Sequence, residues 1–165
     1  MKNKVAKNNP DKVFGFQLLL DLYDCEDDVC DDLNLCYKFL DEIVDKLNME
    51  KQAPPSIFRS DDEKYPDKAG LSGWVPLIES SVVIHTLSNR DFISIDIYTC
   101  GYFDPKEARK FCKSWFGPKK IDSHFIERGK DYYKTDTNYH SLTVRKGKIQ
   151  DLQIKGTPNN ESNKK

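Results

Sequence analysis

The chain has 165 residues and a formal net charge of -1, from 26 Lys and Arg against 27 Asp and Glu. That length fits one domain of ordinary size with a buried core. The charge balance excludes a global basic field that would recruit nucleic acid or an anionic membrane, so we expect neither as a partner. Hydrophobic residues make up 38% and aromatic residues 12%, which argues against a wholly disordered chain.

The sequence indicates neither a membrane anchor nor a metal site. No stretch approaches the roughly 20 apolar residues of a membrane span, and residues 1–12 lack the apolar core of a signal peptide, which predicts a cytoplasmic location. An odd number of cysteines without a CxxC motif predicts neither a disulfide framework nor a zinc site. With only three histidines, a site built on several imidazoles is hard to assemble. The cysteines are Cys25, Cys30, Cys36, Cys100 and Cys112, and the histidines are His85, His124 and His140.

Composition divides the chain into three parts. Residues 1–12 are rich in Lys and Asn and predict a polar arm, whereas residues 13–128 hold most of the apolar side chains and predict a single folded domain. From Gly129 onward apolar residues thin out, so residues 129–165 are predicted to be a flexible polar tail.

The first half of the folded part predicts a strand and then a helix. Alternating apolar residues from Phe14 to Leu22 indicate a strand with one buried face. Residues 31–48 show the three-four spacing of an amphipathic helix. Its predicted apolar positions are Leu33, Cys36, Tyr37, Leu40, Ile43, Val44 and Leu47. The proline-rich segment 52–70 predicts a loop that contains a short strand at 57–59.

The second half predicts a run of strands, a helix and a last strand. The strand-like segments are 73–79, 82–87, 92–99 and 121–127, with a turn at 88–91. Asp104 followed by Pro105 predicts the start of a helix that ends at Gly117. This order predicts an α+β protein in which helices cover one face of a largely antiparallel sheet.

Residues 71–101 carry the side chains that are best suited to catalysis. The set comprises Ser72, Glu79, Ser80, Ser81, His85 and Cys100. Neighbouring strands at hairpin spacing can bring such groups together. From residue types alone, a buried sheet with ordinary Ser and Thr hydrogen bonds remains the simpler interpretation.

The same segment resembles the bacterial S-adenosylmethionine decarboxylase proenzyme family. The family's cleavage site matches Glu79-Ser80, and its auxiliary serine, followed by glycine, matches Ser72. Its processing histidine, in the motif Ile-His-Thr, matches His85, and its catalytic cysteine, in the motif Thr-Cys-Gly, matches Cys100. Weaker similarity reaches the segments around residues 21–25 and 127–129, so the resemblance covers most of the predicted domain.

The resemblance implies a chain that cuts itself between residues 79 and 80 and turns Ser80 into a pyruvoyl group, with no metal and no pyridoxal phosphate. Ser80 would attack the Glu79 carbonyl, Ser72 would support the oxyanion, and His85 would act as the base. The ketone would hold the substrate as a Schiff base and accept its electrons, and Cys100 would return a proton. Without the resemblance, Cys100 reads as a small buried hydrophobe.

The sequence departs from the family pattern where the substrate is bound. Leu87 and Asn89 stand where the family has an aromatic residue and a glutamate that hold the nucleoside, and Ser81 replaces a histidine. Gln17 and Asp24 also differ from the common family residues. Two substrate classes therefore stay open: S-adenosylmethionine, in the synthesis of polyamines such as spermidine, or a smaller amino acid such as ornithine or arginine.

The acidic stretch from Asp24 to Asp32 favours a cationic substrate, although a charge run is more often a solvated face. A third alternative is an uncleaved, noncatalytic homologue. Retention of Ser72, Ser80, His85 and Cys100 together argues against it.

The resemblance also implies a two-layer α/β sandwich and self-association. Cleavage would yield a β chain of residues 1–79 and an α chain that begins at the modified Ser80. The processed protomers are expected to pair as a dimer of heterodimers, with each site near the interface.

Overall fold

The computed structural model describes residues 13–132. The predicted polar arm, residues 1–12, lies outside this range, as does the predicted tail from residue 133 onward. Of the helices in the described part, none is long and apolar enough to cross a membrane.

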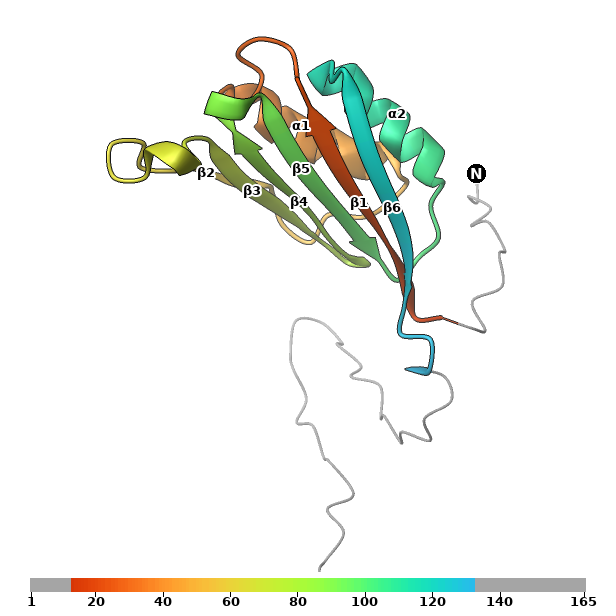
Figure 1. The fold of residues 1–165 in the computed structure, drawn as a ribbon. Helices are drawn as coiled ribbons and strands as arrows, with labels where there is room; N and C mark the ends of the chain where they lie inside the picture. Colours follow the sequence, from red (N-terminus) through yellow and green to blue (C-terminus); the bar gives the residue numbers. More distant parts are fainter. Residues whose placement is uncertain (1–12, 133–165) are drawn as a thin grey trace, which may run out of the picture. The chain divides into compact units, whose positions relative to one another are not determined.

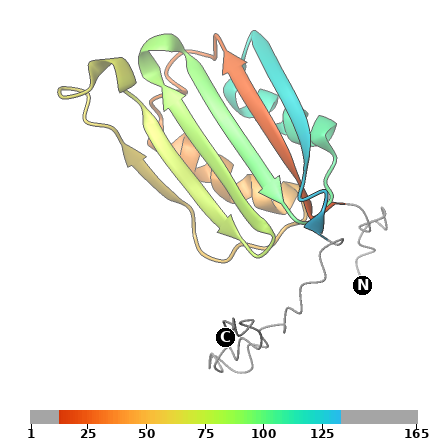
Figure 2. The ribbon, with the colours of Figure 1, turned by 60° about the horizontal axis from the view of Figure 1, so that its bottom comes forward.

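Six antiparallel strands form one sheet in the order β2-β3-β4-β5-β1-β6. The strands are β1 (Gly15–Tyr23), β2 (Ser56–Arg59), β3 (Leu71–Leu77), β4 (Ser80–Leu87), β5 (Phe92–Thr99) and β6 (Lys120–Arg128). Two helices, α1 (Leu33–Lys46) and α2 (Pro105–Phe116), lie side by side on one face of this sheet (Figures 1 and 2). Short 3-10 turns occur at Pro66–Lys68 and Ser88–Arg90. The predicted α+β two-layer sandwich is confirmed.

Both helices begin at the residues that the capping pattern predicts or within two of them. The Asp32 carboxylate accepts a hydrogen bond from the Leu35 N–H at 2.9 Å, which caps α1. At α2, Asp104 accepts from the Lys106 N–H at 2.8 Å, with Pro105 in the first turn. Gly117 ends α2 in a left-handed conformation with φ +52°, which suits a residue without a Cβ.

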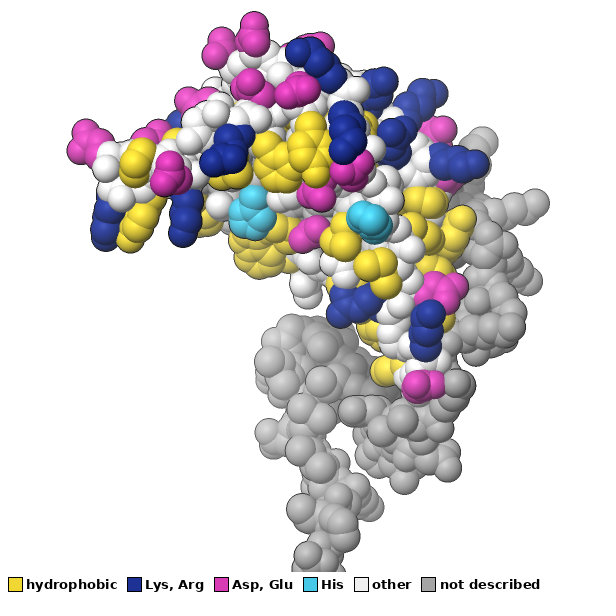
Figure 3. All heavy atoms as spheres, viewed as in Figure 1, with side chains coloured by type: hydrophobic (Ala, Val, Ile, Leu, Met, Phe, Trp, Pro, Cys, Tyr) yellow, Lys and Arg dark blue, Asp and Glu magenta, His cyan; other side chains and the backbone are white. Residues whose placement is uncertain are grey.

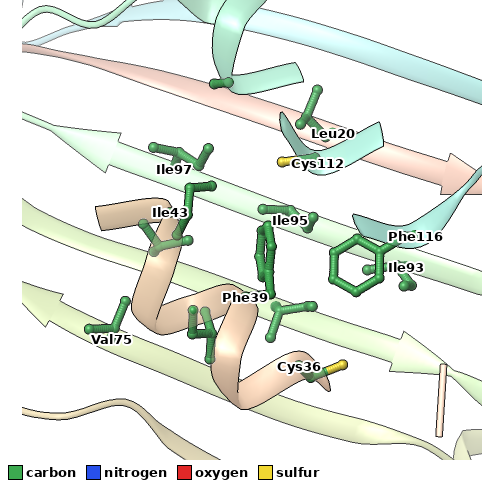
Figure 4. Packing of buried hydrophobic residues seen from close by; sticks show 14 of the residues in the cluster. Leu20, Cys36, Phe39, Ile43, Val75, Ile93, Ile95, Ile97, Cys112 and Phe116 are labelled. Carbon is green, nitrogen blue, oxygen red and sulfur yellow. The ribbon is translucent and has the colours of Figure 1, made fainter. Parts of the chain in front are cut away.

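The hydrophobic core centres on Phe39, a residue missing from the predicted apolar stripe of α1. Its ring is fully buried and contacts the rings of Phe111, Trp115 and Phe116 on α2. Figure 4 shows the Phe39 and Phe116 rings among the buried side chains. The prediction was wrong for Leu33 and Tyr37, which are 38% and 39% exposed. Helix α1 packs against both the sheet and α2, so its buried face is turned toward Phe39 and away from those two positions.

The turn between β3 and β4 differs from the prediction. Glu79 was placed at the end of a strand, but β3 ends at Leu77 and β4 already begins at Ser80. Leu77 pairs with Ser80, so Ile78 and Glu79 alone form the hairpin loop. A two-residue hairpin loop restricts the backbone of its flanking residues, which has consequences at Ser80.

The second face of the sheet carries no helix in the described part. In β1 and β5 the residues that alternate with the buried Leu and Ile positions face this side, among them Asp21 and Asp96. Figure 3 shows this open face, where two histidine side chains lie among apolar and acidic ones. Phe58 and Trp74 on β2 and β3 are 65% and 46% exposed.

Candidate functional site

Ser80 occupies a backbone conformation that serine rarely adopts. It follows the two-residue turn of the β3–β4 hairpin, and its φ is +144°. A residue with a side chain in such a sparsely populated region carries about 1–3 kcal/mol of backbone strain, and it keeps this conformation only because the surrounding structure fixes it. The register of the hairpin thus holds strain next to the Glu79–Ser80 peptide bond.

The Glu79 carbonyl at that peptide bond accepts a hydrogen bond from the Cys100 backbone N–H at 2.9 Å. A fixed N–H donor of this kind withdraws electrons from a carbonyl and stabilises an oxyanion formed from it. The Glu79 carboxylate is held separately, because its Oε2 accepts from the Glu50 N–H at 3.3 Å. The donor at Glu79 was not predicted, since it is a backbone group twenty-one residues later in the chain.

Cys100 is held beside Ser80 by the pairing of β4 with β5. Ser80 lies opposite Thr99, whose buried hydroxyl accepts from the Gly101 N–H at 2.9 Å. The Cys100 side chain is exposed at the end of β5. Gly15 of β1 permits this arrangement, since a Cβ there would lie 2.5 Å from the Thr99 carbonyl oxygen.

His85 and Ser72 form a second group. They are register partners on β4 and β3, and the His85 Nδ1 lies 3.0 Å from the Ser72 Oγ. Either atom can be the donor, depending on which tautomer His85 adopts. Both side chains are exposed on the open face of the sheet.

The two groups lie at different ends of β4. His85 lies five positions after Ser80, which corresponds to about 17 Å of extended strand. A proton-transferring group must come within about 3 Å of its target, or act through one water. Within one chain, the structure therefore brings Glu79, Ser80 and Cys100 together and places Ser72 and His85 elsewhere.

The predicted substrate-binding positions lie at the His85 end. Leu87 is the last residue of β4 and is partly buried. Asn89 follows it in the 3-10 turn, and its side-chain amide donates to the Pro66 carbonyl at 3.1 Å. The Asn89 amide thus holds the loop before β3.

Asp96 adds a titratable group to the open face that the sequence analysis did not single out. Burial raises its pKa, the nearby His85 lowers it in part, and Asp21 raises it further. The pairing of β4 with β5 places Asp96 opposite Val83, two residues from His85. The alternation of β5 could have shown that residue 96 shares a face with residue 85.

A pocket of about 470 Å³ opens near the His85 end of the sheet. Its lining residues are Asp27, Asp28, Cys30, Asp31, Ser88 and Asp91. The four carboxylates make it strongly acidic, although Asp31 is also paired with Arg59. Among residues 13–132, no three His, Cys, Asp or Glu side chains are grouped to hold a metal ion.

Comparisons with known proteins agree in pointing to one family. A family model described as S-adenosylmethionine decarboxylase matches residues 16–129. The chain is similar to S-adenosylmethionine decarboxylase proenzymes of Pseudomonas paraeruginosa (33% identity over 122 residues, 73% of this chain and 72% of the relative) and Clostridium botulinum (29% over 120 residues, 72% and 97%). The crystal structure of the adenosylmethionine decarboxylase from Aquifex aeolicus matches with a TM-score of 0.60 and 29% identity, covering 72% of this chain and 92% of that one.

Proposed function

The chain belongs to the S-adenosylmethionine decarboxylase family, and on that premise we propose that it is a self-processing, pyruvoyl-dependent enzyme that decarboxylates S-adenosylmethionine for polyamine synthesis. One observation carries the proposal. The Glu79–Ser80 peptide bond combines a serine at φ +144° with a carbonyl that already accepts the Cys100 N–H.

Cleavage starts when the Ser80 hydroxyl attacks the Glu79 carbonyl carbon. The oxyanion that forms is stabilised by the Cys100 N–H, and the C–N bond then breaks to leave an ester in place of the amide. Because the amide bond that holds Ser80 in its strained conformation is broken, the strain is relieved in this step. The hairpin therefore favours reaction at this peptide bond over its neighbours.

A base then removes the α proton of Ser80. Elimination releases residues 1–79 with a free Glu79 carboxylate and leaves a dehydroalanine, which water converts to a ketone with loss of ammonia. The resulting pyruvoyl group supplies an electron sink for decarboxylation. Its position beside Cys100 fits this use, since an exposed thiol there can protonate the substrate carbon after carbon dioxide leaves.

His85 cannot be that base within its own chain, because about 17 Å of strand separates it from Ser80. We therefore include self-association in the proposal: two copies pack through their open sheet faces, and Ser72 and His85 of one copy complete the Ser80 site of the other. Exposed apolar side chains on that face support this pairing, with Phe58, Trp74 and Ile126 65%, 46% and 41% exposed.

A second substrate class is favoured by the acidic pocket. The pocket lies next to Ser88, at the same end of the sheet as Leu87 and Asn89. Leu87 offers no aromatic surface for an adenine, and Asn89 offers no carboxylate for a ribose. Carboxylates attract the ammonium or guanidinium group of ornithine or arginine, so the same chemistry on a cationic amino acid is the alternative.

The intact mass of the freshly purified full-length chain tests self-processing. We expect two fragments split between residues 79 and 80, the second lighter than its serine form by the elements of ammonia. Ser80→Ala should stay uncut, whereas the matched control Ser81→Ala should be cut. A single uncut species from the unsubstituted chain would contradict self-processing and favour the noncatalytic homologue.

Release of carbon dioxide from carboxyl-labelled S-adenosylmethionine, ornithine and arginine then identifies the substrate of the cleaved protein. Turnover of S-adenosylmethionine alone supports the main proposal. Turnover of ornithine or arginine alone would replace it with the alternative, and Asp91→Asn should then weaken turnover mainly by raising KM.

A further inference from the structure

Lys51, which the proposed reaction does not use, ties the chain after α1 back to that helix. Its Nζ donates to the Asp41 carboxylate at 2.6 Å and to the Asp41 backbone carbonyl at 3.1 Å. Asp41 belongs to α1, and the Lys51 side chain is only 27% exposed. Two bonds from one ammonium to one residue hold Lys51 at a fixed place on the helix.

The segment of residues 50–52 pairs with the end of β3, next to the cleavage turn. Lys51 lies opposite Leu77 in an antiparallel bridge. The Ile78 N–H donates to the Glu50 carbonyl at 2.9 Å, and a second backbone hydrogen bond of the same length lies on the other side of the bridge. Ile78 is the first of the two turn residues, so residues 50–52 hold the turn where it begins.

Glu79, the second turn residue, is held from two sides. Its carboxylate Oε2 accepts from the Glu50 N–H at 3.3 Å, and its backbone carbonyl accepts from the Cys100 N–H at 2.9 Å. The first donor belongs to the segment that Lys51 fixes, and the second belongs to the end of β5. The direction of the Glu79 carbonyl therefore depends on both segments.

The path from α1 to this segment is short and ordered. Asn48 adopts a left-handed conformation with φ +55°, and the Met49 N–H donates to the Val44 carbonyl at 3.0 Å. This bond closes the last turn of the helix in the manner of a C-cap. Because no long flexible linker lies between α1 and residues 50–52, a displacement of Lys51 is passed on to the turn.

We propose that Lys51 is a positioning residue for self-cleavage. By tying residues 50–52 to Asp41, it keeps the Glu79 carbonyl on the Cys100 N–H while the Ser80 hydroxyl attacks. This role rests on the proposed self-processing, and it concerns the step in which the amide becomes an ester. Lys51 touches none of the reacting atoms, but a small displacement of a reacting group is enough to slow a reaction markedly.

Hydroxylamine measures ester formation apart from the later base step, because it cleaves esters faster than amides. In full-length His85→Ala the ester should form but not eliminate, and hydroxylamine should release residues 1–79. Adding Lys51→Met should slow this release at least about tenfold. Lys51→Arg keeps a cation for Asp41 and should restore most of the rate. Time courses of intact mass after cell-free synthesis measure each rate.

Lys46→Met is the matched control, because Lys46 also ends α1 in an ion pair but reaches Glu107 on α2, at 3.7 Å. It should release residues 1–79 at the unchanged rate. Urea denaturation in a Ser80→Ala background should show that both Met variants are folded. If Lys51→Met is not, Asp41→Asn removes the same ion pair from the helix side and should also slow release.

Two results would overturn the proposal, and they are distinguishable. Release from folded Lys51→Met, or from Asp41→Asn in its place, at the rate of the Lys46→Met control would overturn the role of Lys51 and leave self-processing intact. An unsubstituted chain that stays uncut would overturn self-processing, and the role of Lys51 with it.

Discussion

The two ends of β4 prepare for chemistry in different ways. At the Ser80 end the features that favour cleavage are backbone features: Ser80 has a positive φ, and the Cys100 N–H donates a hydrogen bond to the Glu79 carbonyl. At the other end two side chains, His85 and Ser72, form the arrangement on an exposed surface. Backbone features of a hairpin belong to one chain, but exposed side chains can serve a neighbouring molecule. The cleavage site is therefore built within one chain, whereas the exposed His85 and Ser72 side chains are available to a second copy, as the proposal requires.

Co-expression of two defective chains tests whether Ser80 of one copy is cleaved with the help of His85 from another. The expected effect, recovery of cleavage from none, is the largest of those predicted here. Ser80→Ala and His85→Ala chains should each stay uncut alone. Together they should form mixed pairs in which the His85→Ala chain supplies Ser80 and its partner supplies His85. Intact mass should then show a cleaved fragment that carries the His85→Ala mass.

The control for that experiment pairs His85→Ala with a chain that carries both substitutions. No mixed pair then contains an intact base, so no cleavage is expected. If the first mixture also stays uncut while unsubstituted protein is cleaved, each chain acts alone and the two-copy site is ruled out.

A core substitution should lower the stability of the whole domain, and with it that of both ends of β4. Phe39→Ala removes a fully buried ring between the two helices, and such truncations lower the free energy of unfolding by about 3–5 kcal/mol. Urea denaturation of an uncleavable Ser80→Ala background measures this loss without interference from processing. Leu33→Ala on the exposed side of the same helix should change stability by less than about 0.5 kcal/mol. Equal losses for both would contradict the assignment of the buried face.

Two buried threonines lie near opposite ends of β4, Thr86 on β4 itself and Thr99 opposite Ser80. Their substitution should affect the free energy of unfolding and the rate of cleavage to different extents. Thr86→Val leaves the Leu71 N–H without its partner and removes the shorter of the two hydrogen bonds to the Cys30 carbonyl, so it should lower the free energy of unfolding by about 1–3 kcal/mol. Thr99→Val removes one bond, from the Gly101 N–H, and should cost about 1 kcal/mol.

The rate of cleavage should show the reverse order. Thr99 shapes the segment that presents the Cys100 N–H, so Thr99→Val should slow fragment formation more than Thr86→Val does. Time courses of intact mass measure both. A slower reaction in Thr86→Val would indicate that the far end of β4 controls the turn.

The smallest expected effect concerns two aspartates on the open face. Because burial raises the pKa of Asp96, the folded state binds that proton more tightly than the unfolded state, and its ionised form lowers stability above the folded pKa. Asp96→Asn should therefore raise the melting temperature slightly at pH 7, with the gain disappearing below about pH 4.

Asp122→Asn is the matched control with the opposite sign. Lys120 lowers the pKa of Asp122, so its ionised form favours the folded state above the ordinary pKa, and that contribution is lost as the pH falls. The substitution should slightly lower the melting temperature at pH 7. A parallel shift in both variants would show that overall charge, rather than local environment, governs the open face.

Much of the fold could be predicted because its signals are local. Alternation in β1 and β5 and the Asp104-Pro105 start of α2 depend on neighbours within a few residues, and the structure confirms them. The buried face of α1 was predicted less well. Phe39 was missed because the packing of α1 against α2, far along the chain, decides which side is covered.

The candidate site divides in the same way. The resemblance of the sequence to a family picked out Ser72, Ser80, His85 and Cys100, whereas their residue types alone favoured an ordinary buried sheet. Only the tertiary structure revealed the positive φ of Ser80, the Cys100 N–H on the Glu79 carbonyl and the distance from Ser80 to His85. Strand pairing sets the first two, and pairing between distant segments is not specified by a local pattern of side chains. The third follows from the unbroken course of β4 from Ser80 past His85.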